Sequence, residues 1–121
     1  MWNTYELGDD MLKYNIAETA DELMLTVEEI REIYDAFFED ADEIIRFSRE
    51  ALTSGDCSSL AKRMHALKGM TLNLRMTELA DLATLIELSA KDGTGAKEDQ
   101  LEHLILLNTD LQKQVDLFYK K

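Results

Sequence analysis

The 121-residue sequence contains no proline and only one cysteine. Without proline, nothing in the chain fixes φ and breaks a helix from within. Because Cys57 has no possible partner, an intramolecular disulfide is excluded, and we expect a reducing, cytoplasmic location. Two histidines and one cysteine also give no metal-binding spacing, so we expect neither a metal site nor another cofactor on this chain.

Positive charge is scarce as well, since the formal net charge is −12. Such an acidic chain lacks the basic footprint of a nucleic-acid binder and is repelled by anionic membrane surfaces. No apolar run is long enough to insert into a membrane, and the opening MWNTYELGDD is not typical of a signal peptide. A glycine-rich phosphate loop is missing too, which argues against nucleotide binding. We expect a monomer.

What remains is helical nearly throughout, because alternating strand patterns are absent and apolar residues recur every three or four positions. Thr26 and Glu29 form a predicted capping box, and Asp56 and Thr77 are predicted N-caps. We expect helices over Thr26 to about Leu52, Asp56 to about Leu74, Thr77 to about Ala90, and Ala96 to Tyr119. The inward residues of the last helix are predicted to be Leu101, Leu104, Ile105, Leu111, Val115 and Phe118.

Four amphipathic helices with short connections predict an all-α fold, an antiparallel four-helix bundle. An additional short helix is expected near the N-terminus, from about Asp9 to Ala20, lying across the bundle. The sequence is thus divided into an N-terminal helical segment, residues 1–25, that packs on the bundle, and the bundle itself, residues 26–121. Together they are expected to form a single domain.

His65 is predicted to point outward, since Met64 and Leu67 belong to the apolar stripe of its helix and successive residues are about 100° apart. Its neighbours three, four and seven positions away on the helix surface include two lysines, a glycine and a leucine. They are Lys62, Lys68, Gly69 and Leu72.

This combination has a chemical use. A neutral imidazole is a nucleophile near neutral pH, and a lysine one turn away can offset the charge of a phosphoryl group. Gly69 costs roughly 1 kcal/mol relative to alanine inside a helix, but it would give a partner's active site access to the ring. Residues 57–77 contain four basic residues and no acidic one, which suits docking to an acidic pocket. The four are Lys62, Arg63, Lys68 and Arg75.

Each feature alone also has an ordinary structural interpretation. A lone histidine on a helix is usually a surface residue, the glycine could serve helix packing, and the basic cluster could be a solvated face. Their coincidence on one helical surface favours function. The second histidine, His103, lies beside an apolar stripe without such companions, and we interpret it as structural or surface-exposed.

The run His65-Ala66-Leu67-Lys68-Gly69 resembles the His-x-Leu-Lys-Gly motif of histidine-containing phosphotransfer (Hpt) domains. The resemblance extends over roughly Thr26 to Ala90 and includes Asn73, Leu74 and the segment up to Glu87. Two positions depart from the family pattern: Met70 replaces a small residue, and Arg75 replaces a glycine.

The resemblance implies that the protein is a phosphocarrier of two-component signalling, without kinase activity, that forms phosphohistidine at His65. Lys68 would stabilise the phosphorylated state, Gly69 would give steric access, and Glu87 would orient the imidazole. We expect partner docking through Lys62, Arg63, Gly69, Leu72 and Arg75. The implied partners are response-regulator receiver domains, a hybrid sensor histidine kinase, or both, with Mg²⁺ bound by the receiver.

Two alternatives stay open. The chain could be the phosphoacceptor domain of a chemotaxis-type histidine kinase, in which ATP is the donor through a separate kinase domain. It could also be a non-catalytic helical module that binds receiver domains without phosphotransfer.

Overall fold

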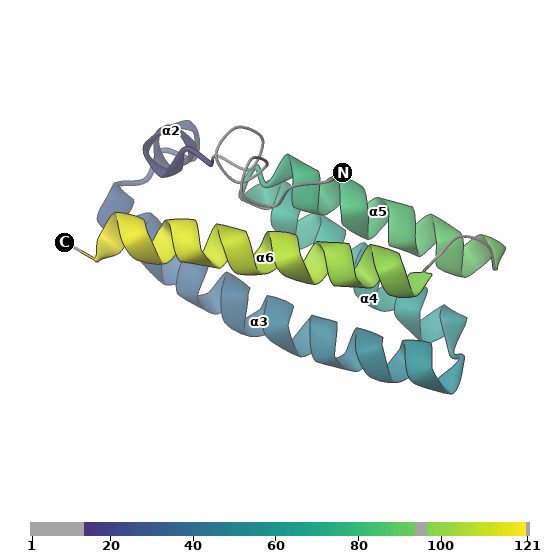
Figure 1. Ribbon diagram of the computed structural model, residues 1–121. Coiled ribbons are helices and arrows are strands. Elements are labelled where there is room, and N and C mark those ends of the chain that lie inside the picture. Colours follow the sequence, from purple (N-terminus) through teal and green to yellow (C-terminus); the bar gives the residue numbers. More distant parts are fainter. Residues whose placement is uncertain (1–13, 94–96, 121) are drawn as a thin grey trace, which may run out of the picture.

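The computed structural model describes residues 14–93 and 97–120, and every regular element in these ranges is an α-helix. This confirms the all-α prediction. The helices, labelled as in Figure 1, are α2 (Ile16–Glu22), α3 (Val27–Ser54), α4 (Cys57–Asn73), α5 (Thr77–Asp92) and α6 (Lys97–Tyr119).

The ends of α3 and the start of α4 follow from local side-chain chemistry. Thr26 and Glu29 form the expected capping box, because each side chain accepts a hydrogen bond from the backbone N–H of the other residue. Gly55 ends α3 with φ +77°, in the left-handed region that glycine adopts without steric cost. Asp56 then caps α4 by accepting from the backbone N–H of Ser59 at 3.0 Å.

Two details of the predicted helices are wrong. Thr77 is the first residue of α5, and the buried Met76 occupies the N-cap position without a side-chain hydrogen bond. Phe118 is 41% exposed. Tyr119 packs against the core instead, and its hydroxyl donates to the Val27 carbonyl at 2.6 Å, because the stripe of α6 continues four positions beyond Val115.

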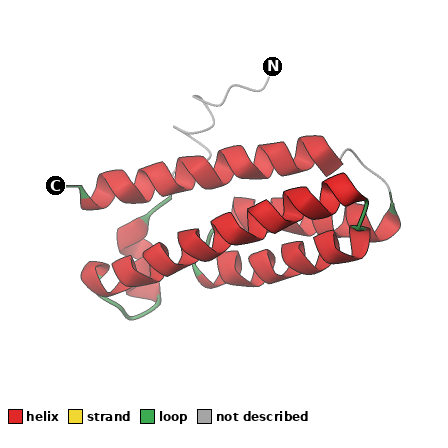
Figure 2. Cartoon of the chain, turned by 90° about the horizontal axis from the view of Figure 1, so that it is seen from below, coloured by secondary structure: helices red, strands yellow, loops and turns green. Residues whose placement is uncertain are grey.

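Helices α3 to α6 form the predicted antiparallel four-helix bundle, in which α3 contacts α4 and α6, and α5 contacts α4 and α6 (Figures 1 and 2). The apolar stripes of all four helices meet in one core. Its largest fully buried members include Tyr34, Ile30, Leu60, Met64, Leu67, Leu79, Ile86, Leu101 and Leu104. Since α4 packs on both α3 and α5, its remaining face is held rigidly toward solvent.

The short helix α2 crosses one end of the bundle and buries Ile16 and Ala20 in the core (Figure 1). Residues 9–13 of the predicted N-terminal helix lie outside the described residues, and α2 ends two residues later than expected. Just before α2, the Tyr14 hydroxyl donates to the Leu74 carbonyl at 2.6 Å and accepts from the Tyr34 hydroxyl at 2.7 Å. The N-terminal segment is therefore tied to the end of α4.

Candidate functional site

His65 lies in the middle of α4 on the face that no other described helix covers. Met64 and Leu67 beside it are fully buried, while the His65 side chain is 68% exposed. The same helix that anchors its apolar side in the core therefore presents the imidazole to solvent, as the sequence predicts.

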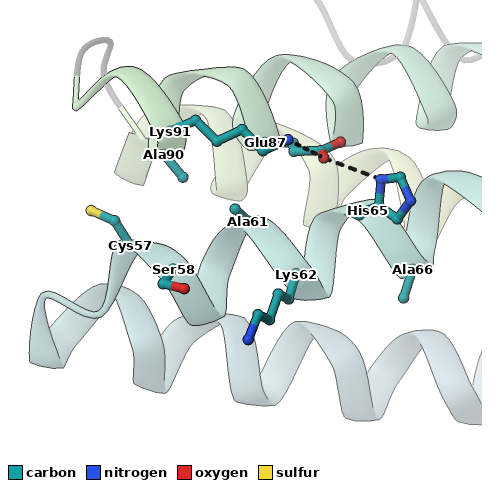
Figure 3. A pocket seen from close by; sticks show the side chains of 9 residues that line it. All are labelled: Cys57, Ser58, Ala61, Lys62, His65, Ala66, Glu87, Ala90 and Lys91. Carbon is teal, nitrogen blue, oxygen red and sulfur yellow. Dashed lines mark hydrogen bonds and ion pairs between the residues drawn. The ribbon is translucent and has the colours of Figure 1, made fainter.

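Glu87 on α5 orients this ring through a contact with one of its nitrogens. The Nδ1 atom of His65 lies 3.1 Å from Oε2 of Glu87, whose side chain is only 8% exposed (Figure 3). Two lysines contact the same carboxylate: Lys91 Nζ lies 3.1 Å from Oε2, and Lys68 Nζ lies 3.7 Å from Oε1. One largely buried carboxylate thus contacts three side chains from two helices.

The charge state of Glu87 follows from these contacts. Burial alone would raise the pKa of the Glu87 carboxyl, but the hydrogen bond and charge of Lys91, the hydrogen bond of His65 and the charge of Lys68 outweigh it. The pKa of Glu87 is therefore lowered from its ordinary value of 4.5, and the group is an anion at neutral pH. An ionised carboxylate can only accept, so Nδ1 carries a proton. In the neutral ring, Nε2 then holds the lone pair and points away from Glu87 (Figure 3).

Three of the predicted docking residues surround His65 on the exposed face of α4. Lys62 and Leu72 are exposed, the latter by 48%. A Cβ atom placed on Gly69 would meet no other atom of the described chain within 4 Å, so packing inside the bundle does not require glycine there. The absence of a side chain at this position leaves open space one turn from the imidazole.

The other two predicted docking residues lie elsewhere. Arg63 turns toward α3, where its guanidinium lies 4.7 Å from the centre of the Phe47 ring. Arg75 follows α4 with φ +60° and pairs with Glu22 of α2 at 3.2 Å. Glycine adopts this left-handed backbone conformation without steric cost, which agrees with the glycine at this position in the pattern that the sequence resembles.

Lys91 was missed by the sequence analysis. It belongs to the site through its contact with Glu87, and with His65, Glu87 and Lys62 it lines an open hollow of about 830 Å³ between α4 and α5 (Figure 3). The other lining residues are Cys57, Ser58, Ala61, Ala66 and Ala90. The spacing of Glu87 and Lys91, four residues apart on one helix, was the available signal.

The second histidine and the described helices add neither a metal site nor a membrane-spanning segment. His103 is half-buried on α6 and does not line the hollow that contains His65. No group of three or more metal-ligating side chains comes together in residues 14–93 and 97–120. None of the described helices combines the length and apolarity needed to span a bilayer.

A rigid helical bundle with an outward, oriented histidine beside lysines is typical of a histidine phosphotransfer domain. The family model of the Hpt domain matches residues 32–115. The chain belongs to the Hpt domain family, whose members act in histidine phosphotransfer within phosphorelays. Neither the curated proteins nor the solved structures contain a significant match to it.

Proposed function

We propose that this protein is a phosphocarrier that accepts a phosphoryl group on Nε2 of His65 from the aspartyl phosphate of one receiver domain and passes it to the aspartate of another. The observation that carries this proposal is the contact between His65 Nδ1 and Glu87 Oε2 at 3.1 Å. It selects one tautomer of the ring and leaves the second nitrogen outward, unprotonated and nucleophilic.

The transfer balances without an additional reactant. The Nε2 lone pair attacks the phosphorus atom, an N–P bond forms, and the O–P bond to the donor aspartate breaks. The aspartate leaves as a carboxylate. Because the ring keeps its Nδ1 proton, it becomes positively charged as the N–P bond forms. In the second transfer an oxygen of the acceptor aspartate attacks phosphorus, an O–P bond forms and the N–P bond breaks. The electron pair of the N–P bond returns to Nε2, so the ring is neutral again.

Glu87, Lys68 and Lys91 support this cycle in different ways. The Glu87 carboxylate lies beside the nitrogen that keeps its proton, and it stabilises the positive ring as that charge develops. Lys68 and Lys91 balance the charge of Glu87 before transfer. Both are on flexible side chains within the same cluster, so they can also neutralise the phosphoryl group after it arrives.

The chain carries no kinase activity in this proposal, since its own residues only receive, hold and release the phosphoryl group. The magnesium ion and the acidic pocket that activate the phosphorus belong to the receiver. Lys62, Gly69 and Leu72 would form the part of the docking surface nearest the ring.

The test uses receiver domains from the same genome that have been phosphorylated with a radioactive label in the presence of Mg²⁺. The protein should acquire label that is lost in acid and retained in base, as expected for phosphohistidine. His65→Gln should abolish the label while its circular dichroism spectrum and thermal melting stay unchanged. Label on a folded His65→Gln variant would overturn the site assignment. Receiver binding without any transfer to the unmutated protein would support a non-catalytic module instead.

A further inference from the structure

A second cationic feature lies on the opposite flank of α4 from Glu87, where α4 meets α3. The guanidinium groups of Arg46 and Arg63 both lie against the ring of Phe47, at 4.8 and 4.7 Å from its centre. Arg46 and Phe47 come from α3, whereas Arg63 comes from α4. Stacking on one aromatic ring restrains two otherwise flexible side chains and holds both charges within 5 Å of the centre of the same ring.

This flank is continuous with the surface around His65. An open hollow of about 500 Å³ between α3 and α4 is lined by Arg63, Ile44, Ser59 and the N-cap residue Asp56, together with Ser58, Lys62 and Ala66 of α4. Those last three residues also line the hollow that contains His65. In Figure 3, Lys62 and Ala66 point toward α3, whereas His65 leans toward α5. The exposed face of α4 is thus a ridge with a hollow on each side.

The cations on the two flanks of α4 differ in how far their charge is already compensated. Lys68 and Lys91 both contact Glu87. Within the described residues, by contrast, no carboxylate pairs with Lys62 or Arg63. Arg46 has only a loose contact of 3.8 Å with Glu43, and both side chains are about 60% exposed, so solvent screens this pair strongly. In the hollow on the α3 side, Lys62 and Arg63 therefore outnumber the Asp56 carboxylate, which is itself bound to the backbone N–H of Ser59, and offer positive charge to an incoming molecule.

We propose that Arg46, Lys62 and Arg63 form a specificity surface that binds carboxylates of the receiver domain outside its phosphorylation pocket. This inference depends on the proposed function, because it assumes that a receiver centres its pocket on His65. With the pocket there, the α3–α4 flank faces the receiver surface beside the pocket. Acidic side chains on that surface would meet restrained guanidinium groups, which suit carboxylates through paired N–H donors.

The test compares Arg46→Gln/Arg63→Gln with Arg49→Gln. Arg49 is a matched control on the same helix, because it is similarly exposed but pairs with Glu102 on the α6 side. The probe is whichever receiver, from a panel of the same genome, exchanges phosphate fastest with the unmutated protein. The double variant should lower the second-order rate constant of transfer about tenfold or more and weaken its dependence on salt, with the rate at saturation unchanged. Arg49→Gln should change neither.

A second variant and a second phosphoryl donor distinguish a loss of receiver binding from a loss of His65 reactivity. Phe47→Leu keeps both charges but removes the stacking, so it should give an intermediate loss. Phosphoramidate, a small donor with no docking surface, should label the unmutated protein and the double variant equally, which shows that His65 chemistry is intact. Equal receiver transfer for the double variant, Arg49→Gln and the unmutated protein would overturn the specificity surface while leaving the proposed function standing.

Two other outcomes would contradict the assignment of this surface to receiver binding. If neither phosphoramidate nor any receiver labels the unmutated protein, the proposed function fails, and this inference fails with it. If light scattering shows a dimer that the double variant lacks, the surface binds a second copy of this acidic chain, and the assignment to receivers is wrong. Charge reversal tests direct pairing between the two proteins. Arg63→Glu should slow transfer from the normal receiver, and a receiver whose acidic side chains are changed to lysine should restore fast transfer to this variant.

Discussion

The Nδ1 atom of His65 lies 3.1 Å from Oε2 of Glu87, although 22 positions separate the two residues in the sequence. The contact joins the exposed face of α4 to the buried edge of α5. It makes the orientation of a surface imidazole depend on a carboxylate that is held inside the protein by two lysines. The chemistry of the ring is therefore set by the packing of α4 against α5.

Glu87→Gln should slow phosphotransfer to His65. The amide oxygen can still accept from Nδ1, but it no longer offers a charge to the ring as the N–P bond forms. The loss of a charge-assisted hydrogen bond, worth about 1.5–3 kcal/mol, corresponds to a decrease of roughly 10- to 100-fold in the rate at saturation. Glu102→Gln, an exposed change on α6, is the control. An unchanged rate in rapid-quench measurements on Glu87→Gln would contradict a role for its charge.

The lowered pKa of Glu87 predicts a pH dependence of stability. The carboxylate is favoured in the folded state, so its contribution is fully present above the ordinary pKa of 4.5 and is lost as the pH falls through the lower folded value. Urea unfolding should therefore show the unmutated protein losing stability relative to Glu87→Gln as the solution is acidified below about 4.5. A stability difference between the two proteins that stays constant through this range would show that Glu87 titrates normally.

Substitution of Gly69 should separate stability from function. Because a Cβ atom there meets nothing in the described chain, Gly69→Ala should raise the free energy of unfolding by up to about 1 kcal/mol through helix propensity. Gly69→Gln should also fold, yet slow transfer from a phosphorylated receiver, since its side chain occupies space that the partner needs. Labelling by phosphoramidate serves as the control and should stay near normal. Rapid receiver transfer to Gly69→Gln would show that this space is not used.

In residues 14–93 and 97–120, two residues other than glycine adopt left-handed backbone conformations, Met24 with φ +61° and Arg75 with φ +60°. Met24 is 91% exposed, so Met24→Gly should stabilise the protein by about 1 kcal/mol through relief of strain alone. Arg75→Gly should gain less, because it also loses the half-exposed ion pair with Glu22. Thermal unfolding of both variants, with Met24→Ala as the control that keeps the strain, would test this order.

The sequence was enough to predict the helices, because their information is local. Apolar residues at three- and four-residue spacing, the Thr26 capping box, Gly55 and Asp56 all act within a turn or two of the chain. The outward direction of His65 follows from the same periodicity. The errors at Thr77 and Phe118 arose where a helix end depends on distant partners, as in the hydrogen bond from Tyr119 to Val27.

The arrangement around the histidine was only partly predictable. Contacts between helices depend on how far each helix is rotated and shifted along its neighbour, which a single sequence does not specify. The link from Glu87 to His65 came from family resemblance, and Lys91 was not included. Arg63 and Arg75 were grouped with His65 because they are close in sequence, but the structure turns one toward α3 and leaves the other at the end of α4.

The position of His65 on the exposed ridge of α4 has a consequence for the order in which partners bind. If His65 relays the phosphoryl group as proposed, its position on one rigid face means that a donor and an acceptor receiver would bind the same surface and could not be bound together. The donor would bind, transfer its phosphoryl group and dissociate before the acceptor could bind. With such alternating binding, the concentrations of the competing receivers and their phosphorylation state would determine the net direction of phosphoryl transfer.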